Sequence, residues 1–200
     1  MERTLHRISA IKDRYKSLDD TIRDKYLNLM INDLNRIKDL SETFLKTFRQ
    51  ESCAVQQETD LYLNILNTIE LLRFELLNRQ INISADKSLI NRKIRLGSSA
   101  VRQIFLNLIM NSMEAKAKNI RIYAEEKKNK YKIFVEDDGQ GLTPAAKRDL
   151  FKPYFTTKSD GFGLGLSICQ KLLSQVQAEI FLRSSQKNKT VFCISFNREP

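Results

Sequence analysis

The stretch GFGLGLSICQ, residues 161–170, sets three glycines at alternate positions and then continues into an apolar pattern with helical spacing. Glycines leave the backbone N–H groups unobstructed, and the start of a helix favours an anion such as phosphate. The stretch therefore predicts either a tight loop-to-helix connection or a phosphate-binding turn. It is not a Walker loop, which needs Gly-Lys-Ser/Thr, and it lacks the preceding strand of a dinucleotide fingerprint.

Three other stretches combine polar residues or glycines with apolar surroundings. NLIMN, residues 107–111, sets two asparagines four apart on one face of an apolar helix, where an unpaired amide costs about 1–3 kcal/mol. EDDGQGL, residues 136–142, ends an expected strand with acidic residues and opens a turn that a ligand can approach. FKPYFTTKSDG, residues 151–161, supplies aromatic side chains, two hydroxyls and a lysine. Taken singly, these stretches also fit a buried polar pair, a hairpin turn and a surface loop.

The chain around these stretches has a mixed α and β pattern after residue 51. The hydrophobic spacing predicts helices over 60–80 and 99–117, a short strand over 82–84, a β-hairpin over 119–139 that turns at 127–129, and strands over 178–185 and 190–196. We expect a sheet covered on one face by helices, which is an α/β sandwich.

Residues 1–51 form a second regime, with apolar residues every three or four positions and no glycine or proline. This spacing predicts long amphipathic helix, and KSLDD at 16–20 offers a turn that folds it into an antiparallel hairpin. Two helices cannot enclose a core. The hairpin is therefore expected either to pair with a second copy as a four-helix bundle or to pack on its own domain. The expected fold class is α+β, with domains over 1–51 and 52–200.

The bulk properties of the 200-residue chain fit a globular protein with a core of its own, since 42% of the residues are hydrophobic. The formal charge of +10 comes from scattered basic residues without a nucleic-acid-binding signature, so no nucleic-acid partner is expected. No apolar run approaches the length of a membrane span. Cys53, Cys169 and Cys193 lack metal-ligand spacing and fit reduced thiols in a cytoplasmic protein.

In this order and with these spacings, the four stretches resemble the ATP-binding domain of two-component sensor histidine kinases. The wider superfamily includes gyrase, the heat-shock chaperones and MutL. The resemblance covers residues 59 to about 196. It implies ATP and Mg²⁺ as ligands, an ATP-binding catalytic domain over 52–200, and a dimerisation and phosphoacceptor hairpin over 1–51.

The resemblance also implies roles for individual residues. Asn111 matches the asparagine that helps to hold Mg²⁺ between the triphosphate oxygens, and Asn107 matches the residue one turn before it, which lies along the phosphates. Asp137 matches the aspartate that accepts a hydrogen bond from the adenine amino group, with Gly139 and Gly141 admitting the nucleotide. The other expected ATP-binding residues border a short mobile lid or form the last glycine box: Phe151, Phe155, Thr156, Thr157, Lys158, Gly161, Gly163, Leu164, Gly165 and Leu166.

Asn107 also bears on the reaction type. Superfamily members that hydrolyse ATP as clamps carry a glutamate at this position, because a carboxylate can orient water for attack. An amide cannot act as that base, so the γ-phosphoryl group is expected to go to an acceptor other than water.

The resemblance implies a histidine acceptor on the hairpin, and His6 is the only histidine of the chain. The expected function is a histidine kinase that forms a homodimer and passes the phosphoryl group to an aspartate of a response regulator receiver domain. Two departures from the family pattern stand beside His6, because Arg7 replaces the usual acid and Ile11 the frequent proline. The alternatives are a degenerate member, in which ATP binding switches a protein-binding hairpin, and an ATP-hydrolysing clamp.

Overall fold

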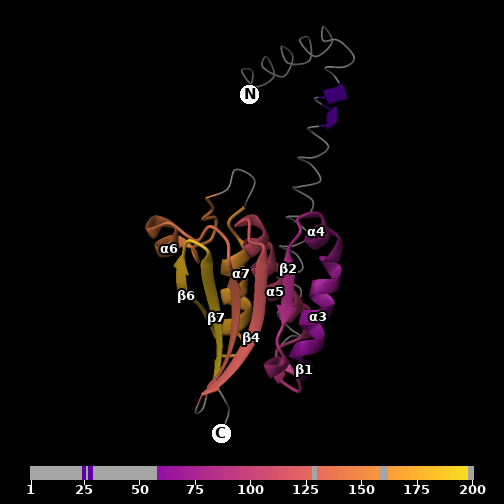
Figure 1. The fold of residues 1–200 in the computed structure, drawn as a ribbon. Helices are drawn as coiled ribbons and strands as arrows, with labels where there is room; N and C mark the ends of the chain where they lie inside the picture. Colours follow the sequence, from indigo (N-terminus) through magenta and orange to yellow (C-terminus); the bar gives the residue numbers. More distant parts are fainter. Residues whose placement is uncertain (1–23, 26, 29–57, 128–129, 158–161, 198–200) are drawn as a thin grey trace, which may run out of the picture. The chain divides into compact units, whose positions relative to one another are not determined.

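The computed structural model of the chain describes residues 24, 25, 27, 28, 58–127, 130–157 and 162–197 (Figure 1). Apart from four positions, the predicted hairpin over 1–51 lies outside the described residues, and so does His6. Lys158 and Gly161 of the predicted site also lie outside them. The hairpin, its four-helix bundle and the role of His6 therefore stay predictions.

The described part of 52–200 is an α+β fold built on one large sheet. Its elements follow the order β1 (Glu58–Asp60), α3 (Leu61–Leu71), α4 (Arg73–Asn78), β2 (Asn82–Ala85), the 3₁₀ helix η2 (Lys87–Leu89), β3 (Lys93–Arg95), α5 (Ser98–Glu114), β4 (Asn119–Lys127), β5 (Lys130–Asp137), α6 (Pro144–Asp149), α7 (Gly165–Ser174), β6 (Glu179–Gln186) and β7 (Lys189–Asn197). The sheet has the strand order β2-β4-β5-β7-β6, and β1 pairs separately with β3. Strand β2 runs parallel to β4, and the other neighbours in the sheet are antiparallel.

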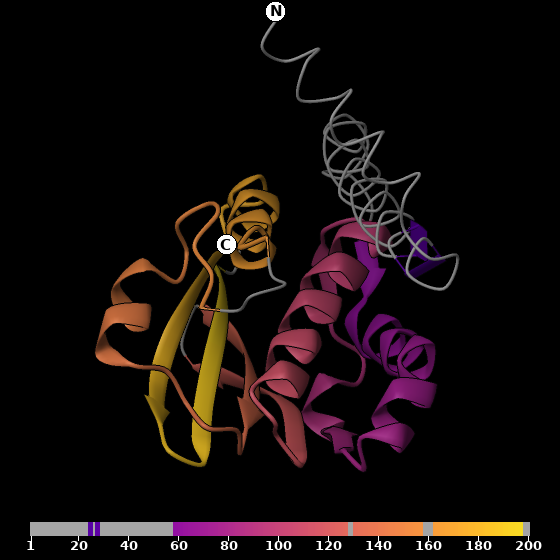
Figure 2. The same cartoon turned by 90° about the horizontal axis from the view of Figure 1, so that it is seen from above.

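Alternation along the central strands decides which face the helices cover. Ile120 and Ile122 of β4, with Ile133 and Val135 of β5, are buried in one core cluster together with residues of α3, α5 and α7 (Figure 2). Successive side chains of a strand point to opposite faces, so the residues between these positions face away from the helices. The predicted sandwich, with helices on one face of the sheet, is confirmed.

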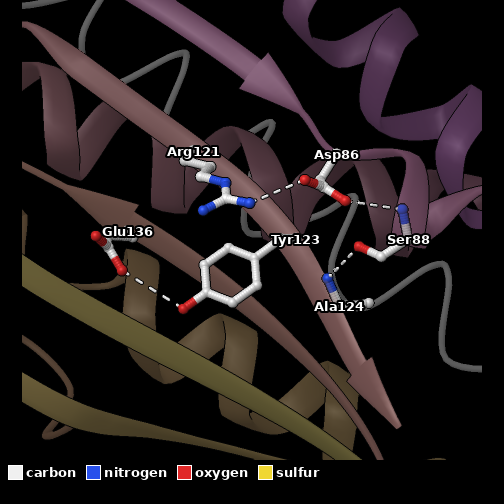
Figure 3. A network of polar contacts seen from close by, with 6 residues as sticks. All are labelled: Asp86, Ser88, Arg121, Tyr123, Ala124 and Glu136. Carbon is white, nitrogen blue, oxygen red and sulfur yellow. Dashed lines mark hydrogen bonds and ion pairs between the residues drawn. The ribbon is translucent and has the colours of Figure 1, made fainter.

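On the opposite face of the sheet, side chains of neighbouring strands contact one another (Figure 3). The ring of Tyr123 stacks on that of Phe134 with 5.0 Å between centroids, and Phe134 is only 1% exposed. The Tyr123 hydroxyl donates to Glu136 across 3.4 Å, and Arg121 donates to Asp86 across 2.9 Å. These contacts shield the aromatic rings on this face, where the described residues place no second layer of helices.

Three details differ from the sequence-based expectations. The predicted helix over 60–80 is divided at Leu72, where ψ is 0°. The β1–β3 pair was not predicted, because a strand of three residues is too short to show alternation. Helix α6 was not predicted either, because its six residues are too few to show a helical period. The hairpin over 119–139 is confirmed as β4 and β5. Within the described residues, no helix is long and apolar enough to span a membrane.

Candidate nucleotide-binding site

Helix α5 carries both predicted asparagines on its half-buried side. The amide nitrogen of Asn107 donates to the carbonyl of Gly165 across 3.0 Å, and its amide oxygen accepts from Gln103 across 3.2 Å. The amide of Asn107 therefore links α5 to the first residue of α7. Asn111 follows one helical turn later and is also half-buried.

Asp137 is the last residue of β5 and is 3% exposed. Its Oδ1 accepts from the Gly139 N–H across 2.9 Å, and its Oδ2 lies 3.0 Å from the hydroxyl oxygen of Ser112 on α5. That hydroxyl also lies 3.2 Å from the carbonyl of Leu108, so its single proton can serve either acceptor. Burial raises the pKa of Asp137, although the Gly139 and Ser112 hydrogen bonds oppose this shift. The carboxylate thus contacts the residue directly after Asn111.

The neighbouring Asp138 has a different role. Its Oδ1 accepts from the backbone N–H groups of Lys118 and Asn119, across 2.7 and 2.9 Å. Burial raises the pKa of Asp138, but the hydrogen bonds from Asn119 and Lys118 outweigh it and hold that pKa below its ordinary value. Asp138 therefore stabilises the turn between α5 and β4, whereas Asp137 contacts Ser112 of α5.

Three glycines of the predicted site have no space for a β-carbon. Gly141 has φ +78°, and its β-carbon would lie 2.5 Å from the carbonyl oxygen of Gln186. A β-carbon on Gly139 would lie 2.8 Å from the β-carbon of Ala115 and from Oδ1 of Asp137. Gly163 has φ +66°, and its β-carbon would overlap the carbonyl of Phe155. At Gly165, by contrast, a β-carbon would make an ordinary contact of 3.5 Å with Asn107.

The start of α7 presents backbone N–H groups that no side chain caps. Leu164 is its N-cap residue, and no side chain makes a capping hydrogen bond there. The first N–H groups of a helix have no partners within the helix, and the dipole is positive at this end. The uncapped ten-residue helix α7 begins beside Asn107, which suits the anionic end of a ligand.

The remaining predicted residues lie between β5 and α7. Gly141 follows Gly139 in the loop before α6, Phe151 and Phe155 are half-buried, and Thr156 and Thr157 are exposed. Leu166, in the first turn of α7, packs against the core. The structure thus brings Asn107 to Gly165, and Asp137 to Gly139 and α5.

A magnesium ion in this site would need few protein ligands. The described residues contain no group of three or more His, Cys, Asp or Glu side chains that could hold a metal. Mg²⁺ is commonly bound by one or two protein oxygens together with substrate phosphates and water. The amide of Asn111 fits such a site, since it provides one neutral oxygen ligand.

Three positions of the site were missed by sequence reasoning. Ser112 directly follows the NLIMN stretch of residues 107–111. Its polar side chain in an apolar helix is a signal from which it could have been predicted. Gln103 lies one turn before Asn107 on the same face, so helical spacing could have found it. The clamp made by Asp138 gave no signal, because its partners at 118 and 119 lie some twenty residues away.

These features together define an α+β domain whose candidate site combines buried and half-buried polar side chains with an uncapped helix start. Residues 97–200 match the model of the family described as histidine kinase-, DNA gyrase B-, and HSP90-like ATPase. The chain therefore belongs to this family, and the match includes every predicted ATP-binding residue.

Within this family, the chain is similar in sequence to sensor histidine kinases. The chain is 35% identical over 92 residues to the tetrathionate sensor histidine kinase TtrS of Salmonella typhimurium, covering 46% of this chain and 16% of TtrS. It is 30% identical over 133 residues to the sensor histidine kinase ZraS of the same species, covering 65% of this chain and 29% of ZraS. The chain thus spans less than a third of either relative.

Solved structures agree with the sequence comparison. The catalytic domain of histidine kinase ThkA superposes with a TM-score of 0.62 at 26% identity, over 71% of this chain and 95% of that domain. ThkA in complex with the response regulator protein TrrA gives a TM-score of 0.70 at 24% identity, over 100% of this chain and 61% of that one. The predicted resemblance to the catalytic core of sensor histidine kinases is confirmed.

Proposed function

We propose that this chain is the core of a sensor histidine kinase that transfers the γ-phosphoryl group of ATP to His6 and then to an aspartate of a response regulator. The observation that carries the proposal is the amide at position 107, held by Gln103 on one side and Gly165 on the other. An amide has no basic site for the proton of an attacking water. A site that binds ATP without such a base favours transfer to a nucleophile on protein.

The site residues fit ATP and Mg²⁺ in distinct ways. The carboxylate of Asp137 would accept a hydrogen bond from the adenine amino group, and any side chain at Gly139 would crowd the Oδ1 atom of that carboxylate. Asn111 would give its amide oxygen to Mg²⁺, and the uncapped start of α7 would hold the phosphates. The bound Mg²⁺ would neutralise charge on the phosphate oxygens. Lys158 and Gly161 are proposed to border the nucleotide from the lid.

The partners follow from the proposed reaction. ThkA has been described in complex with the response regulator protein TrrA, which supports a receiver domain as the second acceptor here. The apolar stripe of the predicted hairpin supports a homodimer through residues 1–51. Light scattering at micromolar concentration should therefore give a dimer that deletion of residues 1–51 abolishes. A cytoplasmic location stays a prediction.

Incubation with γ-labelled ATP tests the proposal. The chain should acquire an acid-labile, alkali-stable label, and His6→Gln should bind ATP with unchanged affinity but take no label. Label that persists in His6→Gln would exclude His6 as the acceptor. Released phosphate without labelled protein would instead indicate a clamp ATPase.

A degenerate member is the second candidate, and Arg7 is the observation that favours it, because an acid beside the histidine would orient the imidazole. Arg7→Glu separates the two candidates. If phosphotransfer is slow for lack of this acid, Arg7→Glu should raise the labelling rate on the order of 10²-fold. ATP binding without label in both forms would support the degenerate member.

A further inference from the structure

The carboxyl group of Asp137 contacts hydrogen-bond donors from two different elements. The backbone N–H of Gly139, in the turn after β5, donates to Oδ1 across 2.9 Å, and the hydroxyl oxygen of Ser112 on α5 lies 3.0 Å from Oδ2. Asp137 is 3% exposed and Ser112 is 1% exposed, so water competes little for either contact. Donors on both oxygens fix the orientation of the carboxyl group more firmly than one donor would.

The single proton of the Ser112 hydroxyl has two acceptors within reach, and Asp137 is the stronger one. The carbonyl of Leu108 lies 3.2 Å from the same hydroxyl oxygen. Within α5 that carbonyl already accepts the backbone N–H of Ser112, because each helical N–H donates to the residue four positions before it. Hydrogen bonds to an ionised acceptor are roughly twice as strong as those between neutral groups. The hydroxyl therefore donates to Asp137 while the carboxyl group is ionised.

The protonation state of this carboxyl group decides which base it can recognise. An ionised carboxylate only accepts hydrogen bonds, whereas a protonated one also donates. The 6-amino group of adenine is a donor and needs the ionised form, whereas the 6-oxo group of guanine or hypoxanthine is an acceptor and suits the protonated form. Burial raises the pKa of Asp137 and so favours the protonated form, while the hydrogen bonds from Gly139 and Ser112 oppose this shift.

We propose that Ser112 is a positioning residue for base recognition, whose hydroxyl keeps Oδ2 of Asp137 an acceptor and so makes the site select 6-amino over 6-oxo purines. This inference rests on the proposed function, in which Asp137 contacts adenine. Each carboxylate oxygen has two lone pairs, so both oxygens of Asp137 keep one for the base. Ser112 also directly follows Asn111, so neighbouring residues of α5 serve the adenine contact and the proposed Mg²⁺ ligand.

Nucleoside diphosphates test the inference on the full chain, because they bind without phosphoryl transfer. The probes are ADP, inosine diphosphate with its 6-oxo group, and purine riboside diphosphate, which has only hydrogen at position 6. Calorimetric titration of Ser112→Ala should show ADP affinity reduced about three- to tenfold, which corresponds to one hydrogen bond. The affinity for purine riboside diphosphate should change by less than about twofold, since no amino group meets the carboxylate. The preference for ADP over inosine diphosphate should therefore fall.

Thr68→Val is the matched control. The hydroxyl of Thr68, like that of Ser112, is buried in a helix and donates to the carbonyl four residues earlier, that of Asn64, across 2.7 Å. Both substitutions remove a buried hydroxyl and should lower the melting temperature, but only Ser112→Ala should change the ratio of the ADP and purine riboside diphosphate affinities. Equal weakening of both nucleotides in Ser112→Ala, or an unchanged ADP affinity, would overturn the inference.

A double substitution tests whether Ser112 acts through the carboxylate. In an Asp137→Asn background, Ser112→Ala should change ADP affinity by less than about twofold, because the acceptor that it holds has been removed. Losses that multiply independently would overturn the inference. A parent chain that binds none of the three diphosphates would overturn the proposed nucleotide site and this inference with it. A parent chain that binds ADP but fails the Ser112 tests would overturn this inference alone.

Discussion

The side-chain amide of Asn107 donates a hydrogen bond to the backbone carbonyl of Gly165 across 3.0 Å and thereby joins α5 to the first residue of α7. The same amide accepts a hydrogen bond from Gln103. Position 107 thus needs a donor and an acceptor in one side chain, which an amide provides and a carboxylate does not. The residue that argues against water as the nucleophile also holds together two helices of the proposed site.

Asn107→Asp tests this structural role. The carboxylate cannot donate to Gly165 and places a charge beside its carbonyl, so the free energy of unfolding should fall by about 1–3 kcal/mol. Urea denaturation measures the change. Gln170→Glu on the exposed side of α7 adds the same charge without removing a described hydrogen bond, and it should stay within about 0.5 kcal/mol of the parent. Equal effects of the two substitutions would refute a specific role for the Asn107 bond.

Asp137→Asn and Asp138→Asn should have opposite effects on stability. Burial raises the pKa of Asp137, so the folded state binds its proton more tightly than the unfolded state, and stability falls as pH rises through that pKa. At neutral pH, Asp137→Asn removes this penalty and should raise the melting temperature. Hydrogen bonds hold the pKa of Asp138 low, so its contribution is present at neutral pH and lost as pH falls through that lowered pKa. Asp138→Asn should therefore lower the melting temperature at pH 7 by a few degrees.

Nucleotide titration of the same pair separates stability from binding. Asp137→Asn should lose at least tenfold in ATP affinity, because the amide oxygen that remains is already engaged by the Gly139 N–H. Asp138→Asn should bind ATP nearly as well as the parent does, since Asp138 faces the turn after α5. Similar losses of affinity in both variants would argue against Asp137 as the adenine contact.

The sequence predicted the parts of the site that repeat with a regular spacing. Alternation over 119–139 located β4 and β5, and the four-residue step from Asn107 to Asn111 placed both amides on one side of α5. The contact between Ser112 and Asp137 was not predictable, because it spans 25 residues and depends on how α5 packs on β5. The division of the helix at Leu72 was likewise not predictable, because no glycine or proline marks it in the sequence. Local periodicity reveals elements, whereas contacts between elements depend on packing.

Cys169 and Cys193 should be inert in the folded protein. Burial raises the pKa of Cys169 to about 12 and also raises that of Cys193, so neither thiolate is populated at neutral pH. In a Cys53→Ser background, a thiol-reactive dye at pH 8 should react only after denaturant is added, and then with two thiols per chain. Rapid reaction of the native protein would contradict the burial of these residues.

Gly163→Ala and Gly165→Ala should separate two roles within one glycine-rich stretch. At Gly163 an alanine would have to adopt φ +66° and would overlap the backbone of Phe155, so stability should fall by about 1–2 kcal/mol or more. At Gly165 the added β-carbon makes an ordinary contact, and alanine favours the helix that begins there, so stability should be unchanged or rise by up to about 1 kcal/mol.

ATP affinity should respond to these glycine substitutions differently from stability. If phosphates lie against the bare backbone at the start of α7, the methyl group of Gly165→Ala occupies part of their space, and ATP affinity should fall although the fold is intact. Thermal unfolding and ATP titration on both variants measure the two effects separately. A Gly165→Ala variant that is stable and binds ATP as tightly as the parent would show that the phosphates do not approach this residue. In that case position 165 would contribute only its backbone carbonyl, which accepts the hydrogen bond from Asn107 and which alanine retains.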